Sequence, residues 1–173
     1  IDKSISVGSF FMNSNFYKLN RNIEFNNYKK EYDIIYIGGN DICPNGKWDT
    51  YKEYSNIYVE HLNWLKNISK LYPDLRIIIK NHPNNKDTFE KKFFEKTNIK
   101  FIDQKLNTYE LAFKSKLILS WGSTMIIEFK SVTNQSYFLN PNMKNVQFVG
   151  DISNKTNICI SKFDELIKTV KNI

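Results

Sequence analysis

The chain has 173 residues and a formal net charge of +7, which comes almost wholly from lysine. This length suits one domain that buries a core without disulfides or metals, and no apolar run approaches the roughly 20 residues that a membrane-spanning helix needs. The lysines are spread among many asparagines, without an RNA-binding aromatic signature, zinc-finger spacing or helix-turn-helix, so no nucleic acid partner is expected. A spread positive field still favours anionic partners such as nucleotide phosphates.

Two cysteines, Cys43 and Cys159, lie far apart and form no C-x-x-C unit. This spacing suggests neither a zinc site nor a redox pair, and it fits a reducing compartment. No signal-peptide pattern opens the sequence. We therefore expect a cytoplasmic protein, with peripheral contact at the inner face of the cell membrane as a further option.

The first 32 residues show little periodicity. The stretch "SVGSF" at Ser6–Phe10 suits either a linker that enters the domain or a first edge strand. Because the chain opens at Ile1 with such a segment, we expect a piece of a longer protein. The predicted organisation is a linker or edge segment over residues 1–32 and one domain over residues 33–173.

From Asp33 onward, short apolar runs alternate with amphipathic stretches, which is typical of a parallel sheet covered by helices. The expected strands are Asp33–Gly38, Leu75–Lys80, Ile99–Ile102, Lys116–Ser120, Gln135–Leu139 and Asn157–Ile160. The expected helices are Tyr51–Leu71, Thr88–Lys96, Thr108–Lys114, Ser123–Val132 and Phe163–Ile173. The predicted fold class is α/β, a Rossmann-like open parallel sheet with helices on both faces.

Two of the expected helices carry clear apolar faces. In the first, residues recur at helical spacing at Tyr54, Ile57, Tyr58, His61, Leu65 and Ile68. We interpret His61 as a packed core residue and not as a ligand. The last helix gathers Phe163, Leu166, Ile167 and Val170 on one side, which we expect to cover the sheet, with membrane contact as the minor alternative.

Ligands of open parallel sheets bind beyond the carboxyl ends of the strands, so polar residues there are the first candidates. The first expected strand is followed by Gly38, Gly39 and Asn40. Glycines at this place let the backbone approach a ligand or make a tight turn, and the sequence favours neither. No G-x-G-x-x-G follows, so a dinucleotide fingerprint is not predicted.

The second expected strand ends in "KNHPNN", Lys80–Asn85. Pro83 biases His82 out of helical geometry, which restricts where the imidazole points. An imidazole that titrates near neutrality can donate a hydrogen bond to a phosphate or act as a general acid. The alternative is an exposed histidine that merely ends a strand. Lys80 shares a strand face with His82, which we attribute to the abundance of lysine.

The fourth expected strand runs into Gly122, Ser123 and Thr124, and then into a helix that carries Glu128. The free N–H groups at a helix start, together with two hydroxyls, suit a phosphate. Glu128 stands five residues after Ser123 and not at the third position of a capping box, so it is placed to accept hydrogen bonds from ribose hydroxyls. The alternative is that Ser123 only caps the helix and that Glu128 is solvated.

Taken together, "IIIKNHP", "NTYELAFKSKLILSWGSTMIIEF" and "SYFLNP" resemble the nucleotide-binding C-terminal half of two-domain glycosyltransferases of the GT-B fold. The group most similar in motif order and spacing is that of the bacterial sialyltransferases, polysialyltransferases and capsule-polysaccharide transferases, which share a His-Pro motif and a later Ser-Ser or Ser-Thr motif. The likeness covers about residues 33–141. The chain departs from it at Phe129, where relatives place a small residue, and at "VTNQS", where they place a Gly-Lys/Gln-Pro turn.

The resemblance implies roles for the residues that match these motifs. His82 would be catalytic, contacting the donor phosphate and assisting departure of the leaving group, with Pro83 shaping the backbone. Ser123 and Thr124, after Gly122, would bind the same phosphate. Glu128 would hold the ribose.

The resemblance also implies a reaction. The chain would be the donor-binding domain of an inverting glycosyltransferase that transfers a sugar, from a CMP-activated donor, to a glycan acceptor in bacterial capsule or lipopolysaccharide synthesis. No cofactor is implied, and no metal is expected because no carboxylate cluster of the D-x-D sort is present. The acidic general base of this family lies in an N-terminal domain that residues 1–32 do not resemble, so we expect the chain alone to bind a donor without transferring its sugar.

Three alternatives stay open. A UDP-sugar epimerase or a CDP-polyol phosphotransferase would keep the fold and change the chemistry, and the preferred nucleotide would distinguish them. A noncatalytic partner domain would keep the nucleotide-binding fold without activity. It would be indifferent to His82→Ala.

Overall fold

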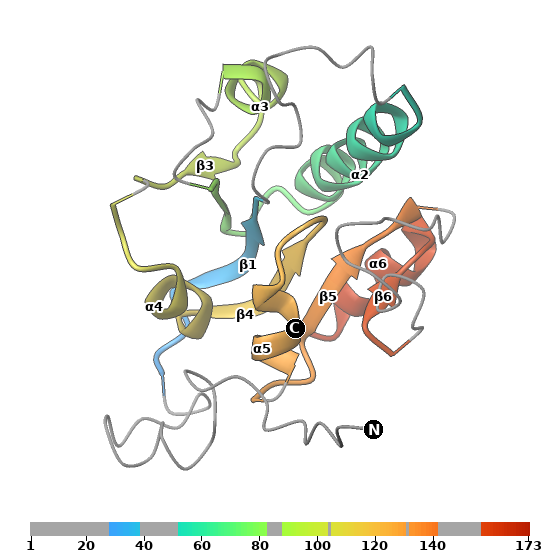
Figure 1. Ribbon diagram of the computed structural model, residues 1–173. Coiled ribbons are helices and arrows are strands. Elements are labelled where there is room, and N and C mark those ends of the chain that lie inside the picture. Colours follow the sequence, from blue (N-terminus) through green and yellow to red (C-terminus); the bar gives the residue numbers. More distant parts are fainter. Residues whose placement is uncertain (1–27, 39–51, 83–87, 104, 131, 142–156) are drawn as a thin grey trace, which may run out of the picture.

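The computed structural model describes residues 28–38, 52–82, 88–103, 105–130, 132–141 and 157–173. Within these ranges the chain forms one six-stranded parallel sheet with helices packed around it (Figure 1). Two parts of the sequence analysis fall outside the described residues. They are residues 1–27 of the predicted linker and the single residues Gly39, Asn40, Cys43 and Pro83.

All of the predicted strands and helices are present, with ends that shift by a few residues. The strands are β1 Tyr32–Ile37, β2 Ile77–Lys80, β3 Lys100–Phe101, β4 Ser115–Ser120, β5 Ser136–Leu139 and β6 Cys159–Ile160. The helices are α2 Lys52–Leu71, α3 Thr88–Phe93, α4 Thr108–Phe113, α5 Met125–Lys130 and α6 Phe163–Lys171. Helix α5 is two residues shorter at each end than expected, and α3 ends three residues before the expected Lys96. The chain turns after Phe93, and the Thr97 hydroxyl then donates a 2.8 Å hydrogen bond to the Phe94 carbonyl.

The strand order is β3-β2-β1-β4-β5-β6, and every neighbouring pair is parallel. The chain therefore builds the sheet outward in one direction from β1 to β3, and in the other direction from β4 to β6. The reversal falls between β1 and β4, which are hydrogen-bonded neighbours. This is the order of a doubly wound Rossmann-like sheet, whose ligand crevice lies at the reversal point. The predicted α/β fold class is confirmed.

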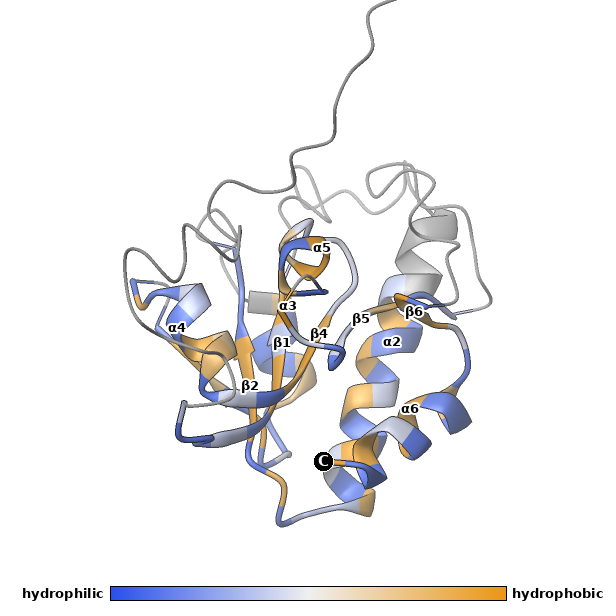
Figure 2. Cartoon of the chain, turned by 90° about the horizontal axis from the view of Figure 1, so that it is seen from below, coloured by the Kyte–Doolittle hydropathy of each residue, from blue (hydrophilic) through white to orange (hydrophobic). Residues whose placement is uncertain are grey.

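The sheet is covered on both faces, which explains its continuous apolar strands. Helices α2 and α3 lie above the sheet in Figure 1, and α4 and α5 lie below it. The residues of β1 from Ile34 to Ile37 are at most 3% exposed. Figure 2 shows the resulting pattern, with hydrophobic strands inside helices whose outer surfaces are largely hydrophilic. His61 of α2 is fully buried, so its interpretation as a core residue is confirmed.

Helix α6 covers the core, as predicted. Its Leu166 is fully buried and Val170 is 5% exposed, and the ring of Phe163 lies 6.2 Å from that of Trp64 on α2. In the described part of the chain, none of the helices has the length and apolar character that a membrane crossing needs.

The amino edge of the sheet is held by a buried carboxylate. Asp33 of β1 is 6% exposed and forms ion pairs with Arg76, at 3.1 Å, and with Lys116, at 2.9 Å. Burial alone would raise the pKa of Asp33, but the hydrogen bonds from Arg76 and Lys116 outweigh it and lower the pKa to about 2. The pairs therefore join β1 to the segments on both of its sides.

Candidate functional site

The carboxyl ends of three strands lie side by side at the reversal point of the sheet. Ile37 at the end of β1 is in register with Lys80 of β2 on one side and with Ser120 of β4 on the other. Lys80 and Ser120 are thus two strand spacings apart, or roughly 10 Å. His82 and Gly122 each follow two residues later. The topology therefore brings the His-Pro and Ser-Thr segments to one edge, at a separation comparable to the size of a nucleotide.

The end of β2 packs tightly against the end of β1. The N–H of Gly38 donates a 2.9 Å hydrogen bond to the Lys80 carbonyl. A Cβ atom at Gly38 would lie 2.7 Å from Oδ1 of Asn81 and 3.1 Å from its Cα. The sequence left open whether this glycine serves a turn or a ligand, and the structure shows that it allows the close approach of Asn81. His82, the next residue, is half-buried.

Lys80 is a candidate that the sequence undervalued. We attributed the presence of a lysine here to the abundance of lysine in the chain. Lys80 is, however, only 2% exposed, and lysine is almost never buried to this extent unless it is paired. The strand alternation assigns Lys80 and Ser120 to one face of the sheet. The burial of Lys80 could have been predicted from its position at the end of a strand that is apolar on both faces.

The turn after β4 is held by its own hydroxyls. The N–H of Ser123 donates a 3.0 Å hydrogen bond to Oγ of Ser120, and the N–H of Met125 donates to Oγ of Ser123 at 3.4 Å. Ser120 is fully buried, Ser123 is half-buried and Thr124 is exposed. The Ser123 hydroxyl thus accepts a hydrogen bond within the turn that leads into α5, which begins at Met125. A hydroxyl that accepts with its oxygen can still donate its hydrogen to a ligand.

Glu128 is bound by a residue that the sequence did not indicate. Ile126 and Phe129 are fully buried and form the core face of α5, which directs Glu128 away from the core. The hydroxyl of Tyr109 on α4 donates a 2.6 Å hydrogen bond to Oε2 of Glu128. Burial raises the pKa of Tyr109, and the hydrogen bond to Glu128 raises it further. Glu128 is thus neither a cap nor simply solvated.

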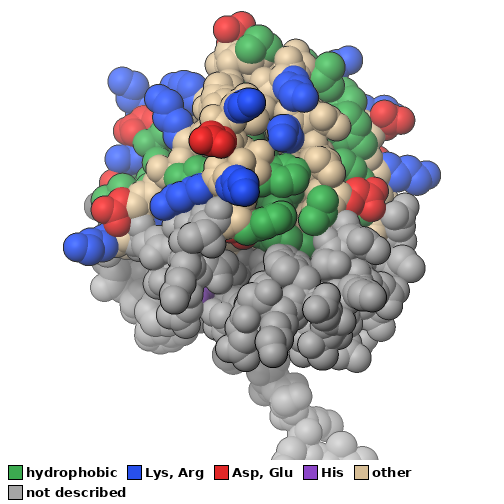
Figure 3. Space-filling model, turned by 90° about the horizontal axis from the view of Figure 1, so that it is seen from above, with side chains coloured by type: hydrophobic (Ala, Val, Ile, Leu, Met, Phe, Trp, Pro, Cys, Tyr) green, Lys and Arg blue, Asp and Glu red, His purple; other side chains and the backbone are tan. Residues whose placement is uncertain are grey.

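The lysines are spread over the surface seen in Figure 3, as they are along the sequence. Figure 3 shows lysine and arginine side chains interspersed with acidic ones over the face seen from above, with no continuous basic stripe. Within the described ranges, no group of three or more histidine, cysteine or acidic side chains is arranged to hold a metal ion.

A cavity of about 270 Å³ lies at the opposite edge of the sheet. It is lined by residues at the amino ends of β1, β2 and β3, including Tyr32, Arg76, Asn98 and Lys100. The amide of Asn98 donates hydrogen bonds to the carbonyls of Pro73 and Leu75, so this hollow belongs to the turn before β2. It is remote from His82 and Ser123 because it opens at the other ends of the strands.

The structure thus brings five of the predicted site residues to one edge of the sheet: His82, Gly122, Ser123, Thr124 and, one helical turn further, Glu128. The remaining ones, Gly39, Asn40 and Pro83, lie outside the described residues. Comparison of the sequence with models of known protein families gives no match, and comparison with curated proteins gives none either.

Proposed function

We propose that this chain is the donor-binding domain of a bacterial glycosyltransferase that uses a CMP-activated sugar to build a surface polysaccharide such as capsule or lipopolysaccharide. It would form one half of a GT-B enzyme and act in the cytoplasm, at the inner face of the cell membrane, on a glycan acceptor. The general base would come from an N-terminal domain. The donor is the substrate, and the proposal requires no cofactor or metal.

One observation supports this proposal most directly. The sheet reverses its winding between β1 and β4, and ligands of such sheets bind outside the carboxyl ends of the strands at that point. His82 follows the strand on one side of β1, and Ser123 and Thr124 follow the strand on the other. An imidazole and two hydroxyls are donors that suit a phosphate group.

The proposed reaction is an inverting displacement. The acceptor hydroxyl loses its proton to the base and attacks the anomeric carbon of the donor. The bond from that carbon to the phosphate oxygen breaks, and CMP leaves with the bonding electrons. Negative charge then grows on the phosphate, where hydrogen bonds from His82, Ser123 and Thr124 would stabilise it more in the transition state than in the bound donor.

Glu128 would hold the ribose in this proposal. A carboxylate has two oxygens and accepts several hydrogen bonds, so the bond from Tyr109 to Oε2 orients the group without exhausting it. Tyr109 would then be a positioning residue for the nucleoside. Its role is the orientation of Glu128 and not direct chemistry.

The test is a titration of CMP, UDP and CDP into the purified chain while its backbone amide resonances are followed. We expect CMP to shift resonances near His82 and Ser123 more than the other two nucleotides do. The variants His82→Ala and Ser123→Ala should each weaken CMP binding about tenfold, since each removes a hydrogen bond to a charged group. Lys70→Ala, in the last turn of α2 and exposed, is the matched control and should bind normally.

Each other outcome selects an alternative. Preference for UDP favours the epimerase, and preference for CDP and its glycerol ester favours the polyol phosphotransferase. A chain that binds none of the three nucleotides contradicts the proposal and favours a noncatalytic partner domain.

A further inference from the structure

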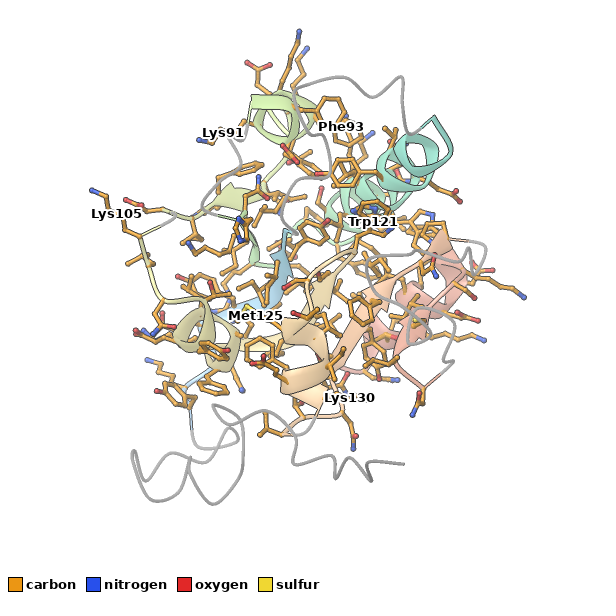
Figure 4. The ribbon with its side chains drawn as sticks, in the orientation of Figure 1. Lys91, Phe93, Lys105, Trp121, Met125 and Lys130 are labelled. Atoms are coloured by element: carbon orange, nitrogen blue, oxygen red, sulfur yellow. The ribbon has the colours of Figure 1, made fainter. Side chains whose placement is uncertain are left out.

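A buried group of aromatic and polar side chains lies beneath the turn that carries Ser123 and Thr124. Its members are Tyr36 of β1, His61 of α2 and Trp121, the residue that directly precedes Gly122, and they are at most 2% exposed. The imidazole of His61 is stacked on the indole of Trp121, with ring centres 5.6 Å apart and planes at 17°. Figure 4 shows Trp121 beside α2, where the chain leaves β4.

One phenol oxygen connects these three elements. Oη of Tyr36 shares a 2.7 Å hydrogen bond with Nε2 of His61, and the backbone N–H of Trp121 also faces this phenol. Burial raises the pKa of Tyr36 well above its usual value, so the phenol stays neutral. The Tyr36 phenol therefore fixes the imidazole that stacks on Trp121, the first residue after β4.

A second aromatic residue supports this arrangement from the side. The ring of Tyr58 meets His61 edge-on at 4.9 Å and lies 5.4 Å from Trp121. The Tyr58 hydroxyl donates a hydrogen bond to Glu90 of α3. Helices α2 and α3 thus both contribute to the group around Trp121.

Packing alone does not account for this choice of residues. Buried polar groups cost free energy unless they are hydrogen-bonded, and apolar side chains of similar size would fill the same space without that requirement. What a bonded polar network adds is a fixed direction for each member. Here the direction that is fixed is that of the backbone entering Gly122, Ser123 and Thr124.

We propose that Tyr36 and His61 are positioning residues, which act through Trp121 to hold the Gly122–Thr124 turn in the geometry that receives the phosphate of a pyrimidine nucleotide. The turn is then held at two points, by His61 stacked on the indole of Trp121 and by Ser120 at the N–H of Ser123. The identity of the ligand in this inference rests on the proposed function. The positioning of residues 122–124 by Tyr36 and His61 is independent of it.

The first test compares Tyr36→Phe with Ser115→Ala. The first variant removes only the phenol oxygen that is hydrogen-bonded to His61. The second removes an equally buried hydroxyl, which donates to the Leu111 carbonyl at the other end of β4. Both should lower the melting temperature. Only Tyr36→Phe should shift the amide resonances of residues 122–124 and weaken CMP binding, by about tenfold, because loss of the bond to His61 releases the imidazole that is stacked on Trp121.

The second test asks for rescue by a conservative change at His61. His61→Leu fills the space but offers Tyr36 no hydrogen bond, whereas His61→Gln offers an amide. We expect the resonances of residues 122–124 and the CMP affinity of His61→Gln to lie close to the wild type, and those of His61→Leu to resemble Tyr36→Phe. Equal effects of the two changes would contradict a positioning role and indicate packing alone.

The outcomes for the two proposals are distinguishable. Unchanged amide resonances of residues 122–124 in Tyr36→Phe would overturn this inference, whatever CMP does. A wild-type chain that binds no nucleotide would overturn the proposed function and with it the ligand named here, while the amide resonances would still decide whether the network holds the turn.

Discussion

The hydroxyl of Tyr109 donates a 2.6 Å hydrogen bond to the carboxylate of Glu128, and this contact joins two short helices that pack on the same face of the sheet. The ring of Tyr109 also lies 5.6 Å from that of Phe129, which is fully buried. Each helix has only six residues, too few to be stable in isolation. Their stability must come from such contacts and from the sheet beneath them.

We predict that Tyr109→Phe lowers the free energy of unfolding by about 1 to 2 kcal/mol, because it removes a hydrogen bond to a charged group at a partly buried site. Urea unfolding measures this directly. Tyr137→Phe is the control, since Tyr137 is also half-buried and its ring, which the change preserves, lies under the Lys130 ammonium. Equal losses in the two variants would contradict the importance of the bond to Glu128.

Much of the fold could be predicted because its central strands are apolar on both faces. "DIIYI" and "RIIIK" have no polar alternation, and this is what strands buried between two layers of helices require. His61 could be assigned to the core because it shares a helical face with Leu65 and Ile68. The positions of His82 and Ser123 at one edge follow from the same assignment, because all the strands are parallel.

Contacts between separate segments could not be predicted. Nothing around Tyr109 indicates that Glu128 lies within hydrogen-bonding distance, since the two belong to different helices. Lys80 looked ordinary in a lysine-rich chain, and only the sheet register shows that it lies beside Ile37 in the buried interior. The start of α5 was also misplaced, because Ser123 belongs to a turn that is hydrogen-bonded to Ser120 and Met125 and the helix begins only at Met125.

The pH dependence of stability should report on Asp33. Its pKa is about 2 in the folded chain, against an ordinary value of 3.8. A carboxyl whose pKa is lowered by folding stabilises the fold above its unfolded pKa, and this contribution is lost as the pH falls from about 4 to about 2. The loss should amount to about 2 kcal/mol, since one pH unit of difference is worth about 1.4 kcal/mol.

Asp33→Asn isolates this contribution. The variant should be less stable than the wild type at pH 7, by about 2 kcal/mol, and the difference should vanish near pH 2. Unfolding curves measured from pH 7 to pH 2 would show this convergence. The exposed Asp74 provides the control as Asp74→Asn, and a difference from wild type that stays constant with pH in Asp33→Asn would contradict the assignment.

Gly38→Ala tests the close packing of β1 against the residue before His82. The added methyl group would overlap both Oδ1 and Cα of Asn81, so we expect a loss of about 1 to 3 kcal/mol from overpacking. Addition of Asn81→Ala removes the side-chain overlap but keeps the backbone one, and it should therefore restore only part of the lost stability. Full recovery in the double variant, measured by urea unfolding, would show that the backbone contact is unimportant.

Ser120→Ala separates the stability of the fold from the geometry of the candidate site. Ser120 and Ser115 lie at opposite ends of β4, are both fully buried and each take part in one hydrogen bond, with the N–H of Ser123 and with the Leu111 carbonyl respectively. Replacement of either by alanine should cost about 1 to 2 kcal/mol of unfolding free energy. Only Ser120→Ala leaves the N–H of Ser123 without its acceptor, so only this variant should also bind CMP more weakly in a calorimetric titration. Weakening in both variants would mean that binding follows global stability, and normal binding in both would separate the Ser123 turn from the nucleotide.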